Sequence, residues 1–108
     1  MEIQITLEEF RLIKSFYPEF TRKQGITSND FIIGWSELMP VVEKIESIQY
    51  KKYLYEIKGY TFIITGRCAR ITDIEGEAII KQQVCNSKIE AVYKAVVEFI
   101  LYHNSQKR

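Results

Sequence analysis

The hydrophobic period of the chain changes twice, and this change limits the fold more than any other feature of the sequence. Apolar residues recur at helical spacing up to residue 48, alternate with polar residues from residue 50 to residue 81, and return to helical spacing from residue 88. Alternation indicates half-buried strands, whereas helical spacing indicates amphipathic helices. The sequence therefore predicts an α+β fold, in which an antiparallel meander of three to four strands packs against amphipathic helices in the order α-α-β-β-β-(β)-α.

The first two helices are indicated by capping residues and by an apolar stripe. Thr6 and Glu9 form a capping box that opens the first helix, and Pro18 ends it. Residues 18–34 are expected to form a loop, with residues 31–33 anchored in the core. Ser36 is expected to cap the second helix, which tolerates Pro40 in its first turn. The apolar stripe of this helix consists of Leu38, Val41, Val42, Ile45 and Ile48.

The last helix is expected to be the longest. Ser87 and Glu90 form a further capping box at its start. One face of the helix is apolar, broadened by Val97 and Phe99. That face consists of Ile89, Val92, Tyr93, Val96, Ile100 and His103.

Two hairpins are expected between the helices. A two-residue turn at Lys58 and Gly59 would place Tyr55 opposite Phe62 and Tyr53 opposite Ile64, with apolar residues on one face. A second hairpin closes around residues 73–76, which would set Ile71 opposite Ala78 and Ala69 opposite Ile80. Gly66 separates the hairpins and permits a turn or a bulge, so residues 60–72 form either one bent strand or two.

A chain of 108 residues suits a single domain. Residues 31–104 are expected to form its core, residues 1–30 a helix and loop that extend it, and residues 105–108 a frayed tail. The two strong amphipathic helices should cover the apolar face of the sheet. If the first helix covers the other face, the result is an α-β-α sandwich.

The sequence also argues against several functions. No apolar run approaches the roughly 20 residues that cross a bilayer, and no secretory pattern opens the chain, so we expect a cytoplasmic protein without a membrane partner. Cys68 and Cys85 lack the spacing of a zinc site and are expected to be reduced thiols. His103, the only histidine, lies where the end of a helix favours a cation. We therefore predict a non-enzymatic protein with no catalytic residues, no cofactor and no metal.

The outer face of the sheet is the expected interaction surface. Residues 50–72 carry five basic side chains and one acidic side chain, and apolar residues lie among them. An apolar centre with a polar rim is typical of protein interfaces, and the occupant would be an unidentified protein or a second copy of the chain. The alternative is that the first helix buries this face. The candidate residues are Lys52, Leu54, Ile63, Arg70, Ile79 and Lys81.

Two stretches of the sequence carry a family resemblance. Residues 35–46, WSELMPVVEKIE, and residues 87–100, SKIEAVYKAVVEFI, resemble the paired helical signatures of the phage ABA sandwich domain. This family consists of short bacterial and prophage proteins without assigned activity. The likeness covers residues 31–104, and it implies an α-β-α sandwich of phage or prophage origin rather than a mechanism.

The element order of residues 36–104 is also similar to that of a double-stranded RNA-binding domain. Such domains need a lysine cluster at the start of the last helix and a loop that reaches the minor groove. This chain offers Lys88 and Lys94, with Glu90 between them, and a connecting loop of only Lys58 and Gly59. Nucleic-acid binding is therefore the alternative function, behind protein contact.

Overall fold

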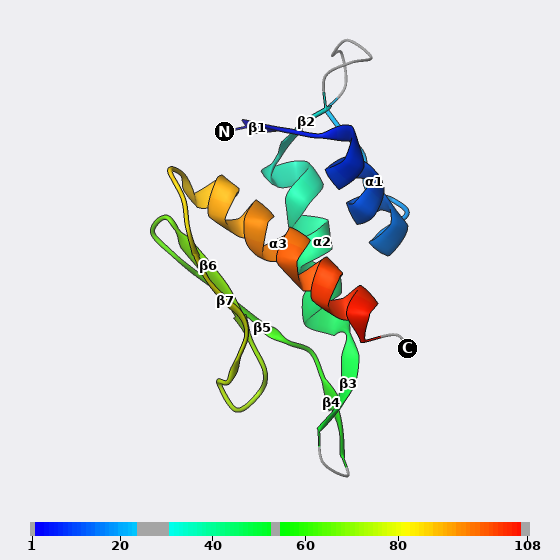
Figure 1. Cartoon of the computed structure of the whole chain (residues 1–108), viewed down its shortest axis with the longest axis vertical. Coiled ribbons are helices and arrows are strands. Elements are labelled where there is room, and N and C mark those ends of the chain that lie inside the picture. The colour runs from blue at the N-terminus through cyan, green and yellow to red at the C-terminus, as the bar shows by residue number, and fades with distance from the viewer. Residues whose placement is uncertain (1, 24–30, 53–54, 107–108) are drawn as a thin grey trace.

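The computed structural model describes residues 2–23, 31–52 and 55–106. Within these residues it confirms the α+β class, with three helices and antiparallel strand pairs (Figure 1). The elements, in chain order, are β1 (Glu2–Ile5), α1 (Leu7–Phe16), β2 (Phe31–Gly34), α2 (Trp35–Ser47), β3 (Gln49–Lys52), β4 (Tyr55–Lys58), β5 (Thr61–Thr65), β6 (Cys68–Thr72), β7 (Ala78–Val84) and α3 (Lys88–Ser105).

The start of α1 confirms the predicted capping box. The Thr6 Oγ1 accepts from the Glu9 backbone N–H at 3.1 Å, and the Glu9 carboxylate accepts from the Thr6 backbone N–H at 3.0 Å. Two of the amides that lack a partner in the first turn are thereby satisfied. The helix ends at Phe16, two residues before Pro18.

β2 replaces the end of the loop that was expected at residues 18–34, and β1 is an additional strand before α1. They form an antiparallel pair in which Ile3 lies opposite Ile33. Each strand has only four residues, too few for alternation to stand out in the sequence. Residues 2–23 also contribute Ile5, Ile13 and Phe20 to the common core. These three side chains lie within residues 2–23, the part of the expected extension that the structure describes.

α2 begins two residues earlier than expected. Gly34 is its N-cap, and the Glu37 Oε1 accepts a hydrogen bond of 2.7 Å from the Gly34 N–H. This hydrogen bond takes the place of the expected cap at Ser36. Because the helix begins earlier, Pro40 lies in its second turn rather than in its first. The predicted stripe is confirmed, because Leu38, Val41, Val42 and Ile45 are each at most 2% exposed and Ile48 caps the end.

The predicted turn at Lys58 and Gly59 is wrong. β4 pairs with β3 rather than β5, so that Gln49 lies opposite Lys58 and Lys52 opposite Tyr55. The expected pair of Tyr55 with Phe62 does not form. The expected position of Tyr53 falls outside the described residues.

Gly59 instead joins the β3–β4 ribbon to the rest of the molecule. Its φ of +88° is one that L side chains rarely adopt, and its N–H donates to the Ile48 carbonyl at 2.8 Å. A Cβ at this position would collide with the Glu46 carbonyl at the end of α2. Glycine is thus required here by a close approach of two backbone segments.

Residues 60–72 form two strands, joined by a hairpin turn at Gly66 and Arg67. β5, β6 and β7 build a three-stranded antiparallel sheet in that order. The hairpin around residues 73–76 is confirmed, and the Asp73 Oδ1 holds it by accepting from the Glu75 and Glu77 backbone N–H groups at 2.9 and 3.0 Å.

The register of β6 with β7 differs from the predicted one. Ile71 lies opposite Ile80 rather than Ala78, and Ala69 lies opposite Gln83 rather than Ile80. Register shifts in β7 account for the difference, because an extra residue in one strand offsets every pair beyond it. Ala69, Ile71 and Ile80 still face the core, as expected.

The three-stranded sheet forms an outer layer of the molecule. α3 packs on β6 and β7, while α1 packs on the side of α3 away from that sheet (Figure 1). The predicted α-β-α sandwich has the sheet in the middle, so the observed layer order differs from it. The apolar face of α3 is wide because helices and strands surround it, and Ala91, Ala95 and Phe99 are buried as well.

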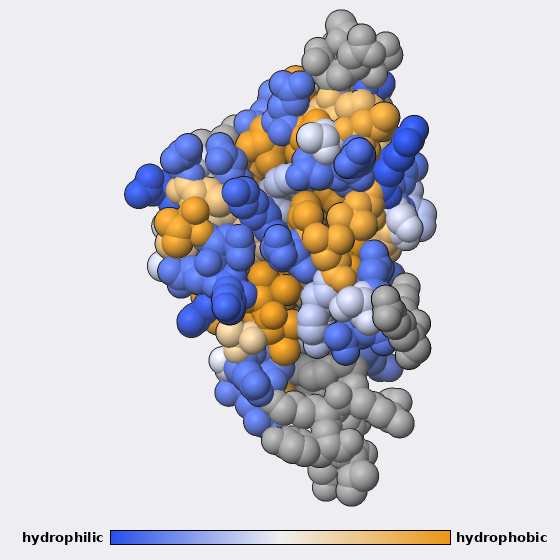
Figure 2. Space-filling model, in the orientation of Figure 1, coloured by the Kyte–Doolittle hydropathy of each residue, from blue (hydrophilic) through white to orange (hydrophobic). Residues whose placement is uncertain are grey.

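Hydrophobic residues reach the molecular surface only in separate patches on the face shown in Figure 2, with hydrophilic side chains between them. Scattered apolar residues are normal for a protein surface and do not by themselves indicate an interface. None of the helices within the described residues is both long and apolar enough to span a membrane.

Candidate functional site: the outer face of the three-stranded sheet

Alternation along β5 and β6 divides their side chains between two environments. Phe62 and Ala69 face the helices and are buried, whereas their neighbours Ile63 and Arg70 face the opposite side. Ile63 is half-buried and Arg70 is exposed. Since α1 lies beyond α3, it does not cover this outer face. The alternative in which the first helix buries the outer face is therefore wrong.

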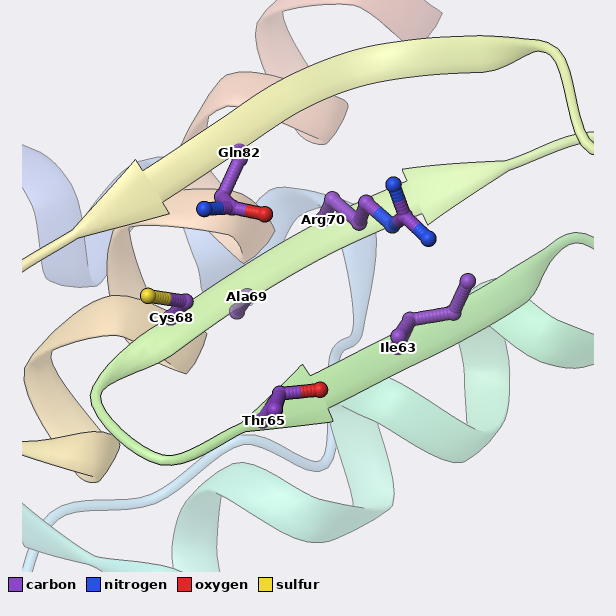
Figure 3. A pocket seen from close by; sticks show the side chains of 6 residues that line it. All are labelled: Ile63, Thr65, Cys68, Ala69, Arg70 and Gln82. Carbon is purple, nitrogen blue, oxygen red and sulfur yellow. The ribbon is translucent and has the colours of Figure 1, made fainter.

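A shallow hollow of about 190 Å³ lies on this outer face. Ile63 lies opposite Arg70, and Thr65 lies opposite Cys68, so two cross-strand pairs form its sides. Figure 3 shows these four side chains and Gln82 on the face turned away from the helices. The lining residues are Ile63, Thr65, Cys68, Ala69, Arg70 and Gln82. We call this feature the sheet hollow.

The structure brings together only some of the six predicted surface residues. Ile63 and Arg70 line the sheet hollow, and Lys81 is exposed on β7. Ile79 was expected on the outer face, but it packs against the core, next to a register shift in β7. Lys52 belongs to β3, in the separate β3–β4 sheet. The predicted contribution of Leu54 lies outside the described residues.

The strands of this sheet carry charge of one sign. β5, β6 and β7 contain Arg70 and Lys81 but no aspartate or glutamate. The acidic residues Glu75 and Glu77 lie in the turn beyond the strands. The sheet hollow is therefore bordered by positive charge, which attracts acidic groups and is weakened by salt.

Of the reactive side chains named above, the structure describes Cys68, Cys85 and His103. Cys68 and Cys85 are both free, and only Cys68 lines the sheet hollow. His103 stacks on Phe99, with ring centroids 5.9 Å apart, and meets the edge of Phe16 at 5.6 Å. It thus packs in an aromatic cluster near the end of α3. The described part of the chain also contains no group of three or more His, Cys, Asp or Glu residues able to hold a metal ion.

A second hollow, of about 440 Å³, lies between β1, α1 and α3 and was missed by the sequence analysis. Its lining residues are Glu2, Ile3, Gln4, Glu9, Glu90, Tyr93 and Lys94. We call it the acidic hollow. The only hint of it in the sequence is a tyrosine on the apolar face of the last helix. Its carboxylates come from distant segments, so no local pattern reveals them.

Tyr93 is the unusual residue of the acidic hollow. It is 7% exposed, and its hydroxyl is buried without a hydrogen-bond partner among the described residues. Burial, and secondarily the neighbouring Glu9 carboxylate, raise the pKa of Tyr93 well above its ordinary value of 10.0. The hydroxyl therefore stays protonated at neutral pH and can donate or accept a hydrogen bond.

Comparison of the chain with protein-family models, with curated proteins and with solved structures finds no match. The class of protein is therefore defined by its fold and surfaces alone. It is an α+β domain with an open sheet face.

Proposed function

We propose that the protein is a non-enzymatic interaction module that binds an acidic protein partner through the outer face of its three-stranded sheet. The observation that carries this proposal is the sheet hollow, where Ile63 and Arg70 lie side by side on a face that α1 leaves open. An apolar side chain of the partner would enter the hollow, and its carboxylates would meet Arg70 and Lys81. Interfaces concentrate their binding energy at such small anchor sites.

Charge favours a different protein over a second copy of the chain. A two-fold dimer through this face would bring the same patch against itself, so that Arg70 and Lys81 would face a second set of cations. Like charges across an interface oppose association. We therefore expect a monomer in light scattering and a heteromeric complex with the partner.

The chemistry of the face also favours protein over nucleic acid. Sheets that bind single-stranded nucleic acid present aromatic rings on which bases stack. The side chains lining the sheet hollow are aliphatic or polar, and the aromatic residue of β5, Phe62, is buried on the other face. Two exposed cations on the strands are also few for a surface that neutralises many phosphates.

The origin of the chain is a separate proposal. The resemblance of residues 35–46 and 87–100 to the phage ABA sandwich domain supports a phage or prophage source. A cytoplasmic location is proposed separately, on the sequence pattern described above. The stretches correspond to most of α2 and to the first part of α3, so the resemblance concerns helices that build the core. It adds nothing about the sheet face, and the outer position of the sheet is not what an α-β-α sandwich implies.

The proposal is tested by affinity capture from the source cells with matched variants. Ile63→Asp and Arg70→Glu alter the sheet hollow, while Leu101→Asp and Lys44→Glu make the same chemical changes at exposed positions on α3 and α2. We expect one protein to be retained by the wild type and both controls, lost by both hollow variants, and released by moderate salt. The captured protein is then purified and titrated with the same variants.

Three outcomes would overturn the proposal. If all variants retain the captured protein, the interface lies elsewhere. If the control variants also lose it, the charge of the protein rather than the sheet hollow determines capture. Salt-dependent binding of duplex RNA or DNA that requires Arg70, with no protein retained, would favour the nucleic-acid alternative.

A further inference from the structure

The acidic hollow combines negative charge with room for a small group. Its lining includes Glu2, Glu9 and Glu90 against one cation, Lys94, and its volume of about 440 Å³ lies within the roughly 300–1,000 Å³ of small-molecule sites. Glu2 is paired with Lys23 at 3.1 Å. The carboxylates left for a ligand are therefore those of Glu9 and Glu90.

Glu9 retains one oxygen for such a ligand. Its Oε1 accepts from the backbone N–H and the hydroxyl of Thr6, at 3.0 and 3.1 Å. The capping box therefore fixes the carboxylate at the start of α1 and leaves Oε2 without a role in the cap. A carboxylate oriented in advance binds a cation with less loss of conformational freedom.

The Tyr93 hydroxyl is an independent sign of a ligand. Nearly all buried polar atoms in proteins have a hydrogen-bond partner, and an exception calls for an explanation. This hydroxyl is buried, has no partner among the described residues and belongs to a residue that lines the acidic hollow. A ligand that donates hydrogen bonds would satisfy it together with the two carboxylates.

We propose that the acidic hollow binds a guanidinium group, with Glu9 and Glu90 accepting its N–H groups and the Tyr93 hydroxyl completing its hydrogen bonds. A guanidinium offers five donors in one plane and remains charged at every relevant pH. It therefore suits several acceptors spread around a hollow. Anions are disfavoured by the carboxylates, and no described group of His, Cys, Asp or Glu suits a metal.

This inference is independent of the proposed function, because the acidic hollow shares no lining residue with the sheet hollow. The guanidinium can come from a free small molecule or from an arginine side chain of a peptide. Both sources share the same chemistry at Glu9, Glu90 and Tyr93, and they differ in whether the flanking backbone adds affinity.

Calorimetric titration tests the inference with two pairs of probes. Arginine amide is compared with citrulline amide, which has nearly the same shape but no charge, and a blocked Gly-Arg-Gly peptide is compared with its citrulline counterpart. The protein is tested as wild type, Tyr93→Phe, Glu90→Gln and Glu43→Gln. Tyr93→Phe keeps the ring, and Glu43 is an exposed glutamate on α2 outside the hollow.

We expect the arginine probes to bind the wild type and Glu43→Gln equally, and the citrulline probes to bind neither. Tyr93→Phe and Glu90→Gln should each weaken binding about tenfold, as expected for the loss of a charge-assisted hydrogen bond. Tighter binding of the peptide would identify a peptide arginine as the source, and equal binding would identify a small molecule. Absence of binding, equal binding of citrulline, or unchanged affinity in Tyr93→Phe and Glu90→Gln would overturn the inference.

Discussion

Ile63 of β5 lies directly opposite Arg70 of β6, on the sheet face that points away from the helices. In an antiparallel sheet such a pair forms one unit of the surface, because its two side chains stand next to each other. An aliphatic group beside a guanidinium can contact apolar and acidic groups of a partner at the same time. This pair is therefore the centre of the proposed interface.

The two faces of the sheet should respond differently to the same substitution. Ile71→Ala empties a fully buried site and should lower the free energy of unfolding by about 2–5 kcal/mol. Ile63→Ala, on the half-buried outer face, should cost about 1 kcal/mol. Both substitutions replace isoleucine by alanine in a strand and therefore lose the same β-propensity. The difference between their free energies of unfolding, measured by urea denaturation, then shows which side chain is buried. Equal losses would show that Ile63 is a core residue.

Gly59 and Gly66 both have positive φ, but only Gly59 lies against another segment. At Gly66 an added Cβ meets nothing within 4 Å, so Gly66→Ala should cost about 1–2 kcal/mol of stability from the backbone alone. Gly59→Ala should cost roughly 2–5 kcal/mol, because the methyl group also meets the Glu46 carbonyl. Thermal unfolding of the two variants measures this difference. If Gly59→Ala is the milder change, the β3–β4 ribbon does not join α2 as described.

The Asp73 carboxylate organises the β6–β7 turn. Asp73→Ala removes the acceptor of two backbone amides and should destabilise the protein by about 1–3 kcal/mol. Asp73→Asn keeps an acceptor oxygen and should cost clearly less. Chemical denaturation of both variants is the measurement. A similar loss in both would mean that the charge, rather than the turn hydrogen bonds, stabilises this region.

Tyr93 should make stability fall at high pH. Because the folded state raises the pKa of Tyr93, the folded protein keeps this proton after the unfolded chain has lost it near pH 10. The contribution is complete below pH 10 and declines above it. Relative to Tyr93→Phe, the free energy of unfolding of the wild type should therefore fall by about 1.4 kcal/mol per pH unit above pH 10. Parallel curves for the two proteins would contradict this assignment.

At neutral pH the same pair of proteins tests the unsatisfied hydroxyl. Tyr93→Phe removes a buried polar atom that has no partner, so the variant should be at least as stable as the wild type. A loss of about 1 kcal/mol or more would indicate a hydrogen bond to the hydroxyl in solution.

Local patterns in the sequence predicted the helices and the inner face of the sheet. The stripe of α2 and the cap at Thr6 depend on residues within a few positions of each other, and such signals survive folding unchanged. The alternation of β5 and β6 placed Ile63 and Arg70 on the outer face for the same reason. The prediction that Ile80 of β7 faces the core is also confirmed despite the register shift, because Ile80 is buried.

The errors concern contacts between distant segments. Gly59 was interpreted as a hairpin turn because a glycine at positive φ is common there, whereas its conformation serves a close approach to α2. Register shifts in β7 were not visible in the sequence, and Ile79 was therefore assigned to the outer face, although it packs against the core. The acidic hollow was missed because β1, α1 and α3 each supply part of it.

Alkylation of Cys68 tests the central claim about the sheet face most directly. Cys68 lines the sheet hollow, and Cys85 lies outside it and serves as an internal control in the same sample. Peptide mass spectrometry after a short treatment with N-ethylmaleimide gives both rates, with and without the captured partner at saturation. We predict that the partner slows alkylation of Cys68 about tenfold and leaves the rate of Cys85 unchanged. An unchanged rate at Cys68 in the saturated complex would contradict the assignment of the outer sheet face as the binding surface.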